Sequence, residues 1–278
     1  MPDPPENIKT GVAAIDEAFP AGMPRDTFTL ISGEGGTGKS VLLSEFLYRR
    51  LEAGEPGIYI CLDDMPKTIM QGLMRFGWDV QKFLDNGKLN FIDCFSFRIQ
   101  PEKTPDWVTL IKDPSDLLGF ANALEMMMDR LNMHNHGVVI IDSLTEFMTL
   151  AEPGLLIEAI KTWRARGSKE RGVTFFASMH FGIGAFEKTV DVFDYVVDGI
   201  IDLRYDPFFM RQGKLIKQLR VRKMKGAQHS TAWIPFEVGP GGVEIYREAP
   251  MRELGPEETE KVLSAMLRQL RERQKASK

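Results

Sequence analysis

Apolar runs of strand length alternate with longer amphipathic segments through the first two thirds of the chain. The strand-like runs are rich in β-branched and aromatic residues and cover 28–33, 57–63, 88–96, 137–143 and 173–179. Between them, apolar residues recur at helical spacing over 40–54, 67–77, 115–134 and 155–170. This alternation predicts an α/β fold, a mostly parallel sheet with helices on both faces.

The pattern changes after residue 190. Four short strand-like runs follow one another and predict a C-terminal antiparallel hairpin region: 196–206, 215–224, 231–239 and 242–248. From Met251 onward, Val262, Leu263, Met266 and Leu267 stand at helical spacing ahead of a basic stretch. We therefore expect an N-terminal tail (1–6), one domain (7–250) and an amphipathic helical tail (251–278).

The composition of the chain mainly excludes classes of protein. Of 278 residues, 43% are hydrophobic and 27% charged, which is typical of a globular protein, and the net charge of −4 gives no overall attraction for nucleic acid or anionic lipid. No apolar run approaches the ~18 residues of a membrane span, and the polar, proline-rich start is unlike a secretory signal. Cys61 and Cys94 are expected to be buried thiols. A cytoplasmic protein is predicted.

The strongest motif lies between the first strand and the first helix. The segment GEGGTGKS fits the phosphate-loop pattern G-x-x-x-x-G-K-[ST] and comprises Gly33, Glu34, Gly35, Gly36, Thr37, Gly38, Lys39 and Ser40. Glycines let backbone N–H groups turn toward phosphate, and the helix N-terminus adds partial positive charge. Lys39 is expected to reach the β- and γ-phosphates, and the Ser40 hydroxyl to bind Mg²⁺. The motif predicts binding of ATP or ADP.

Three aspartates follow buried strands. Asp142 ends the strand 137–143 and is the candidate acid that orients Mg²⁺ and its waters, with a plain helix cap as the alternative. Asp63 and Asp64 end the strand 57–63 as an adjacent pair. Two neighbouring carboxylates repel each other and favour either solvent or a cation. They are therefore either a solvated strand end or part of the chemistry.

Several ordered motifs resemble the KaiC-like branch of the RecA superfamily of ATPases, over about residues 7–247. The entry segment 8–40, the acidic pair in LDD (62–64), VVDGIIDL (196–203) and RKMKGAQH (222–229) all look like that family. Phe19–Gly22 departs mildly from its usual paired glycines, and Asp-Asp replaces its usual Glu-Glu. The resemblance implies a RecA-like three-layer sandwich, bound Mg·ATP, and a ring of subunits, most simply a hexamer.

The resemblance also implies a role for the acidic pair. In RecA-type folds the carboxylate that activates water ends the strand beside the phosphate-loop strand, which we expect here to be 57–63. Asp64 is the preferred base, with Asp63 as its neighbour in a supporting role. Aspartate is one methylene shorter than glutamate, and a misplacement of about 1 Å can slow a reaction ~10²-fold. Slow hydrolysis is therefore expected.

Seven basic residues and no acidic one lie between Arg211 and Lys225. A solvated hairpin face is one interpretation. By resemblance, Lys223, Lys225 and His229 would instead contact the nucleotide of a neighbouring subunit, with Lys225 in place of the more frequent arginine. His180, with Ser178, stands where the superfamily has a γ-phosphate sensor, although a structural core histidine is the alternative.

Three functions remain open from the sequence. The first is a ring-forming ATPase that acts as a nucleotide-dependent switch on an unidentified protein partner. The second is a nucleotide-binding scaffold with negligible hydrolysis, as in archaellum-associated relatives, and the third a recombinase-like DNA-repair accessory. The segments 149–154 and 180–191, which would correspond to DNA-contacting loops, carry one lysine and several acids, so nucleic-acid binding is disfavoured.

Overall fold

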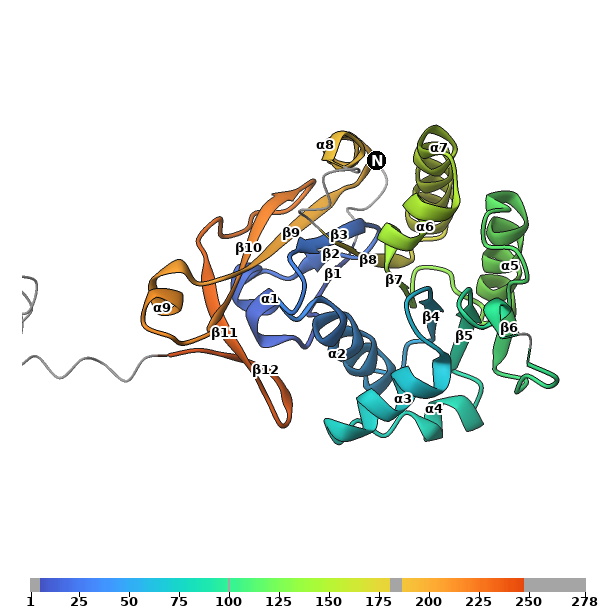
Figure 1. Cartoon of the computed structure of the whole chain (residues 1–278), viewed down its shortest axis with the longest axis horizontal. Coiled ribbons are helices and arrows are strands. Elements are labelled where there is room, and N and C mark those ends of the chain that lie inside the picture. Colours follow the sequence, from blue (N-terminus) through green and yellow to red (C-terminus); the bar gives the residue numbers. More distant parts are fainter. Residues whose placement is uncertain (1–5, 100, 181–186, 248–278) are drawn as a thin grey trace, which may run out of the picture. The chain divides into compact units, whose positions relative to one another are not determined.

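The computed structural model describes residues 6–99, 101–180 and 187–247, all of them except Arg247 within a compact unit that spans Met1–Tyr246 (Figure 1). The predicted C-terminal helix (251–278) and residues 1–5 of the predicted N-terminal tail lie outside the described residues. None of the helices in the described part is long and apolar enough to cross a membrane.

A ten-stranded sheet forms the middle layer, in the order β12-β11-β10-β9-β3-β8-β7-β4-β5-β6. Its strands are β3 (Phe28–Gly33), β4 (Gly57–Cys61), β5 (Leu89–Asp93), β6 (Val108–Leu110), β7 (Val138–Asp142), β8 (Thr174–His180), β9 (Gly199–Tyr205), β10 (Lys217–Met224), β11 (Ile234–Gly239) and β12 (Gly242–Ile245). The strands from β9 to β6 in this order are parallel, and β10, β11 and β12 are antiparallel. A separate pair joins β1 (Asn7–Ile8) and β2 (Met23–Pro24).

Helices cover both faces of the sheet, which gives three layers (Figure 1). One face packs on α1 (Ala13–Ala18), α2 (Lys39–Glu52), α3 (Pro66–Arg75) and α4 (Gln81–Asp85), and the other on α5 (Leu117–Arg130), α6 (Leu144–Leu150), α7 (Pro153–Trp163) and α8 (Glu187–Val196). Alternate strand residues supply the two cores: Ile31 faces the first and Leu30 the second. The predicted RecA-like α/β sandwich is confirmed.

Two expectations need correction. The segment 196–206 was expected to be antiparallel, but β9 runs parallel to β3 and becomes antiparallel only toward β10. The helix expected over 155–170 ends as α7 at Trp163 and continues as a π-helix, Arg164–Glu170. Gly167 in that segment packs directly on the Phe175 ring of β8, since an added Cβ would lie 2.5 Å from that ring. The short helix α9 (Pro207–Arg211) connects β9 and β10, and a single 3₁₀ turn covers Ser96–Arg98.

The order of the strands overturns a third expectation. Asp63 and Asp64 do not end the strand beside the phosphate-loop strand, because β8 and β7 lie between β3 and β4. Parallel neighbours need crossover connections, so strands that follow each other in the sequence are free to pair elsewhere. What the arrangement does provide is a common edge, where the carboxyl ends of β3, β8, β7 and β4 meet.

Candidate functional site

The phosphate loop leads from β3 directly into α2, as the sequence predicts. Gly36 and Gly38 have φ of 77° and 98°, a left-handed conformation that favours glycine. The Thr37 hydroxyl donates to the carbonyl of Glu34 at 2.8 Å and closes the turn. The Tyr205 hydroxyl lies so near that an added Cβ on Gly36 would be 2.6 Å from it. Residues within the loop therefore determine its conformation, and β9 lies beside it.

The ammonium of Lys39 uses its three donors within the protein. It contacts the carbonyls of Gly33 and Glu34, both at 2.8 Å, and Nδ1 of His180 at 3.1 Å. Because an ammonium can only donate, Nδ1 of His180 accepts and the ring proton sits on Nε2. Burial lowers the pKa of Lys39 from 10.5 to about 8, opposed by the charges of Asp142, Asp63 and Glu34. Burial and the nearby Lys39 lower the pKa of His180.

Asp142 ends β7 beside this lysine, and two hydroxyl groups hold its carboxylate. Tyr59 on β4 donates to Oδ2 at 2.9 Å, and Ser178 on β8 donates to Oδ1. Sequence reasoning missed Tyr59, which reads as an ordinary core residue. The only signal was that a buried phenol needs a hydrogen-bond partner. Ser178, predicted as part of a phosphate sensor, has its hydroxyl engaged by Asp142 instead.

The two adjacent carboxylates have different environments. The carboxylate of Asp64 accepts from the backbone N–H of Met65 at 2.8 Å, just before α3. The Asp63 side chain reaches solvent, yet surrounding protein removes part of its water. That desolvation, with the charges of Asp142 and Glu146, raises the pKa of Asp63 from 3.8 to about 6, against the opposing influence of the nearby Ser143 hydroxyl and the charge of Lys39.

Two cavities meet at Asp63. One, of about 290 Å³, is lined by polar Ser40, Ser44, Tyr59, Asp63, Asp64 and Asp142 and by an apolar wall that includes Leu73, Phe76 and Trp78. The other, of about 390 Å³, is lined by Leu62, Asp63, Phe95, Arg98, Ser143, Thr145, Glu146 and His180. The backbone N–H of His180 donates to the Thr145 hydroxyl at 2.9 Å, which anchors the end of β8. Asp63 thus lies between the two spaces.

The first cavity fits a magnesium ion held mainly by a nucleotide. Ser40 and Asp142 line it together and offer a hydroxyl and a carboxylate, the oxygen donors that Mg²⁺ prefers. Within residues 6–99, 101–180 and 187–247, no group of three or more His, Cys, Asp or Glu side chains could hold a metal. Mg²⁺ usually takes one or two carboxylates plus phosphates and water, so this donor set suits it.

The predicted hairpin residues lie at the opposite edge of the sheet. The backbone N–H of Lys225 bonds the carbonyl of Asp198, whose own N–H bonds Phe28 at the start of β3. Lys225 is exposed. Lys223 is half-buried, and its ammonium donates to the carbonyls of Val197 at 2.8 Å and of Asp194 in α8. Desolvation, followed by the charge of Lys225, lowers the pKa of Lys223.

His229 completes the predicted trio and also has contacts within its own chain. Its Nδ1 lies 3.2 Å from the carbonyl of Ala227, and its ring lies 5.8 Å from that of Phe19. The structure therefore separates the predicted residues into two groups. Lys39, Ser40, Asp63, Asp64, Asp142, Ser178 and His180 share one edge of the sheet, whereas Lys223, Lys225 and His229 do not reach it.

Comparisons with known proteins agree on one family. The family model described as "ATPase: KaiC" matches residues 8–250. A UPF0273 protein of Thermotoga maritima is 30% identical over 243 residues, which cover 87% of this chain and 96% of that protein. A UPF0273 protein of Pyrococcus furiosus is 29% identical over 245 residues, with coverage of 88% and 96%. The crystal structure of a KaiC-like protein from Pyrococcus horikoshii matches with a TM-score of 0.70 at 24% identity, covering 88% of this chain and all of that one, and supports the fold.

Proposed function

The chain belongs to the KaiC family of P-loop ATPases within the RecA superfamily, and from that membership we propose that it hydrolyses Mg·ATP slowly, in a ring of subunits, as a nucleotide-dependent switch on a protein partner. The observation that carries the proposal is the meeting of four side chains at one edge of the sheet. Three of them line one cavity: Ser40, Asp63 and Asp142. The fourth, Lys39, contacts His180, which lines the adjoining cavity. The four come from three separate parts of the chain and interact electrostatically.

Each of these groups has a task in phosphoryl transfer to water. The backbone of the phosphate loop and Lys39 hold the phosphates, and Lys39 exchanges its internal acceptors for phosphate oxygens. Ser40 and Asp142 would hold Mg²⁺, Asp142 through water. When bound, the metal neutralises charge on the phosphate oxygens. His180 lies 3.1 Å from Lys39 and is placed to respond when a γ-phosphate draws Lys39 away.

We propose Asp63 rather than Asp64 as the general base. A base works best when its pKa lies close to the operating pH, and partial desolvation raises the pKa of Asp63 to about 6. Asp63 also borders both cavities, including the one that holds His180. Asp64 instead serves as an acceptor for the backbone at the start of α3. Asp63 would take the proton of the attacking water.

The hairpin edge supports a site shared between subunits. Lys225 is level with Phe28, five residues before Gly33, which corresponds to about 17 Å along a strand. Lys225 is therefore too far to contact the nucleotide in its own chain, so a contact with nucleotide requires a second copy. A head-to-tail contact of this kind closes into a ring when its rotation permits. The family resemblance favours a hexamer.

Mixing two inactive variants tests this proposal. Lys39→Ala should lose ATP binding by calorimetry yet retain the hairpin, and Lys225→Ala should retain ATP binding yet lose hydrolysis. Mixed, they should regain part of the hydrolysis through hybrid contacts. Lys161→Ala is the control and should hydrolyse normally, because Lys161 is an exposed lysine that pairs with Glu158 on the same helix, α7.

The outcomes separate the candidate functions. ATP affinity unchanged in Lys39→Ala would disprove the assigned phosphate loop. No recovery on mixing, together with a monomer mass in saturating ATP by light scattering, would remove the shared site and leave the basic hairpin as a solvated face or docking patch. Tight ATP binding without measurable turnover would favour the nucleotide-binding scaffold. Salt-sensitive retention of DNA would favour the recombinase-like accessory.

A further inference from the structure

Asp142 is held from both sides by neighbouring strands. In the sheet, β7 lies between β4 and β8, and each neighbour sends one hydroxyl to one carboxylate oxygen. Tyr59 donates to Oδ2 at 2.9 Å, and Ser178 donates to Oδ1. Cys61 is the register partner of Asp142, and Tyr59, two residues before Cys61, projects from the same face. On the other side, Ser178 follows Ala177, the register partner of Ile141. The two hydrogen bonds therefore restrain both the rotation of the Asp142 side chain and the direction of its carboxylate.

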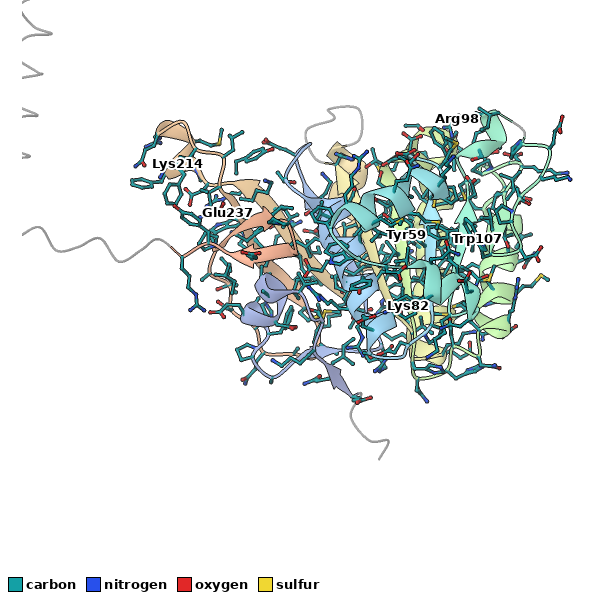
Figure 2. The ribbon with its side chains drawn as sticks, turned by 90° about the horizontal axis from the view of Figure 1, so that it is seen from below. Tyr59, Lys82, Arg98, Trp107, Lys214 and Glu237 are labelled. Carbon is teal, nitrogen blue, oxygen red and sulfur yellow. The ribbon has the colours of Figure 1, made fainter. Side chains whose placement is uncertain are left out.

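The two donors are themselves rigid. Tyr59 is 1% exposed and Ser178 fully buried. The Tyr59 ring packs against Phe91, with centroids 5.8 Å apart, and lies in the interior of the molecule (Figure 2). A phenylalanine would fill the same space without the hydroxyl. The role of the phenol is therefore to supply a donor at a fixed point, and that donor is given to Asp142.

The restraint matters because a strong competitor lies nearby. The ammonium of Lys39 attracts Asp142 electrostatically. While Lys39 is satisfied by Gly33, Glu34 and His180, it has no donor left for Asp142. Once phosphates draw Lys39 from those acceptors, a freely rotating Asp142 could pair with it. Two fixed hydroxyls oppose that rotation and leave a further lone pair on each oxygen.

We propose that Tyr59 and Ser178 are positioning residues that keep the Asp142 carboxylate directed toward the cavity shared with Ser40, ready for the waters around nucleotide-bound Mg²⁺. This inference rests on the proposed function and adds to it the selectivity for Mg·ATP over free ATP. Partners that orient a metal-binding carboxylate commonly change metal affinity by about 10–100-fold. Their loss should weaken the magnesium-dependent part of nucleotide binding and spare the rest.

The test titrates Mg²⁺ into the full chain with a non-hydrolysable ATP analogue, with calorimetry as the readout, and repeats the analogue titration in EDTA. Tyr59→Phe should raise the half-saturating Mg²⁺ concentration about 10-fold, with affinity in EDTA unchanged. Ser178→Ala should shift it in the same direction. Tyr48→Phe is the matched control. Tyr48 stacks on Trp78 of the cavity wall but does not itself line the cavity, so both values should stay unchanged.

Each result decides the inference. An unchanged Mg²⁺ midpoint in Tyr59→Phe overturns it, as does an equal loss of affinity with and without Mg²⁺, which indicates general damage to the site. If Tyr59→Phe fails to fold by circular dichroism, Ser178→Ala alone decides. A wild-type protein that binds the analogue equally well in Mg²⁺ and EDTA overturns the proposed magnesium-dependent function, and the inference with it.

Discussion

Asp63→Asn preserves the size of the side chain and removes its ability to accept a proton, so it tests the general base directly. The raised pKa of about 6 arises first from desolvation and then from the negative charges of Asp142 and Glu146. At such a pKa the carboxylate is ionised in about 9% of molecules at pH 5 and about 91% at pH 7. Wild-type kcat/KM should therefore fall about 10-fold between pH 7 and pH 5.

The variant should bind ATP and lose turnover. A positioned base commonly contributes about 10²–10⁴-fold to the rate, and that is the expected loss in kcat. In a plot of rate against pH, the residual activity should lack the fall at acid pH (the acid limb) that protonation of Asp63 causes in the wild type. The terminal phosphate of ATP also titrates near pH 6, but that limb is common to every variant. Steady-state hydrolysis measured from pH 5 to pH 8 separates the two contributions.

Asp64→Asn provides the matched control one residue further along. It should keep the acid limb and most of the turnover, because Asp64 accepts a backbone N–H at the start of α3. If Asp64→Asn abolishes turnover and Asp63→Asn does not, the base is Asp64 and the reasoning from the pKa is wrong. A wild-type kcat/KM that is constant from pH 5 to pH 7 would contradict it equally.

Unfolding gives a second readout for Asp63 that needs no catalysis. The folded-state pKa lies above the unfolded value of 3.8, so the proton favours the folded state. That stabilisation is complete below pH 3.8 and is lost as the pH rises through about 6. Asparagine is neutral throughout, so Asp63→Asn should raise Tm at pH 8 and change it little at pH 4. A lower Tm at pH 8 would contradict this.

Two further predictions concern other groups. Burial alone would raise the pKa of Glu55, but hydrogen bonds from Arg25, Arg50 and the Gly137 amide hold it at about 2, below 4.5. Glu55→Gln should therefore cost about 3 kcal/mol of unfolding free energy at neutral pH. In urea titrations this loss should shrink as the pH falls from 4.5 toward 2, and an equal loss at pH 3 and pH 7 would refute the linkage. His180→Ala should reduce the preference for ATP over ADP in competition binding while ADP affinity is kept, since His180 contacts Lys39. The variant His134→Ala, at an exposed histidine, is the control, and an unchanged ratio in His180→Ala would refute a sensor role.

The sequence predicted the parts of the site that are local. The phosphate loop depends on eight consecutive residues between a strand and a helix, and β3 begins and ends where its apolar run does. Gly36 and Gly38 adopt the positive φ that the motif requires. Asp142 was identified because a strand rich in valine and isoleucine ends there. Information of this kind lies within a few residues and needs no knowledge of the tertiary fold.

Long-range pairing decided what the sequence missed. Nothing in the segment 57–63 indicates that it pairs with β5 and β7 rather than with β3. From the sequence, Tyr59 is an ordinary core residue. Its role depends on the pairing of β4 with β7, which places Asp142 2.9 Å from its hydroxyl. Lys223 was expected to point outward, but its ammonium meets carbonyls of Asp194 and Val197, which precede it by 29 and 26 residues. Each of these partners depends on which strands become neighbours.

The two carboxylates have different environments, and this contrast supports the separate roles proposed for them, a position beside Mg²⁺ for Asp142 and the activation of water for Asp63. Asp142 receives hydroxyl donors from Tyr59 and Ser178, which restrain the direction of its carboxylate. Asp63 loses water without an equal gain in donors, so its pKa rises to about 6 and its affinity for a proton increases. A carboxylate beside a bound cation must keep its direction, and a carboxylate that takes a proton must be able to keep that proton. The neighbouring strands provide the first condition and incomplete solvation the second. The two residues are chemically identical, so the difference in their environments is the basis on which the two roles are proposed.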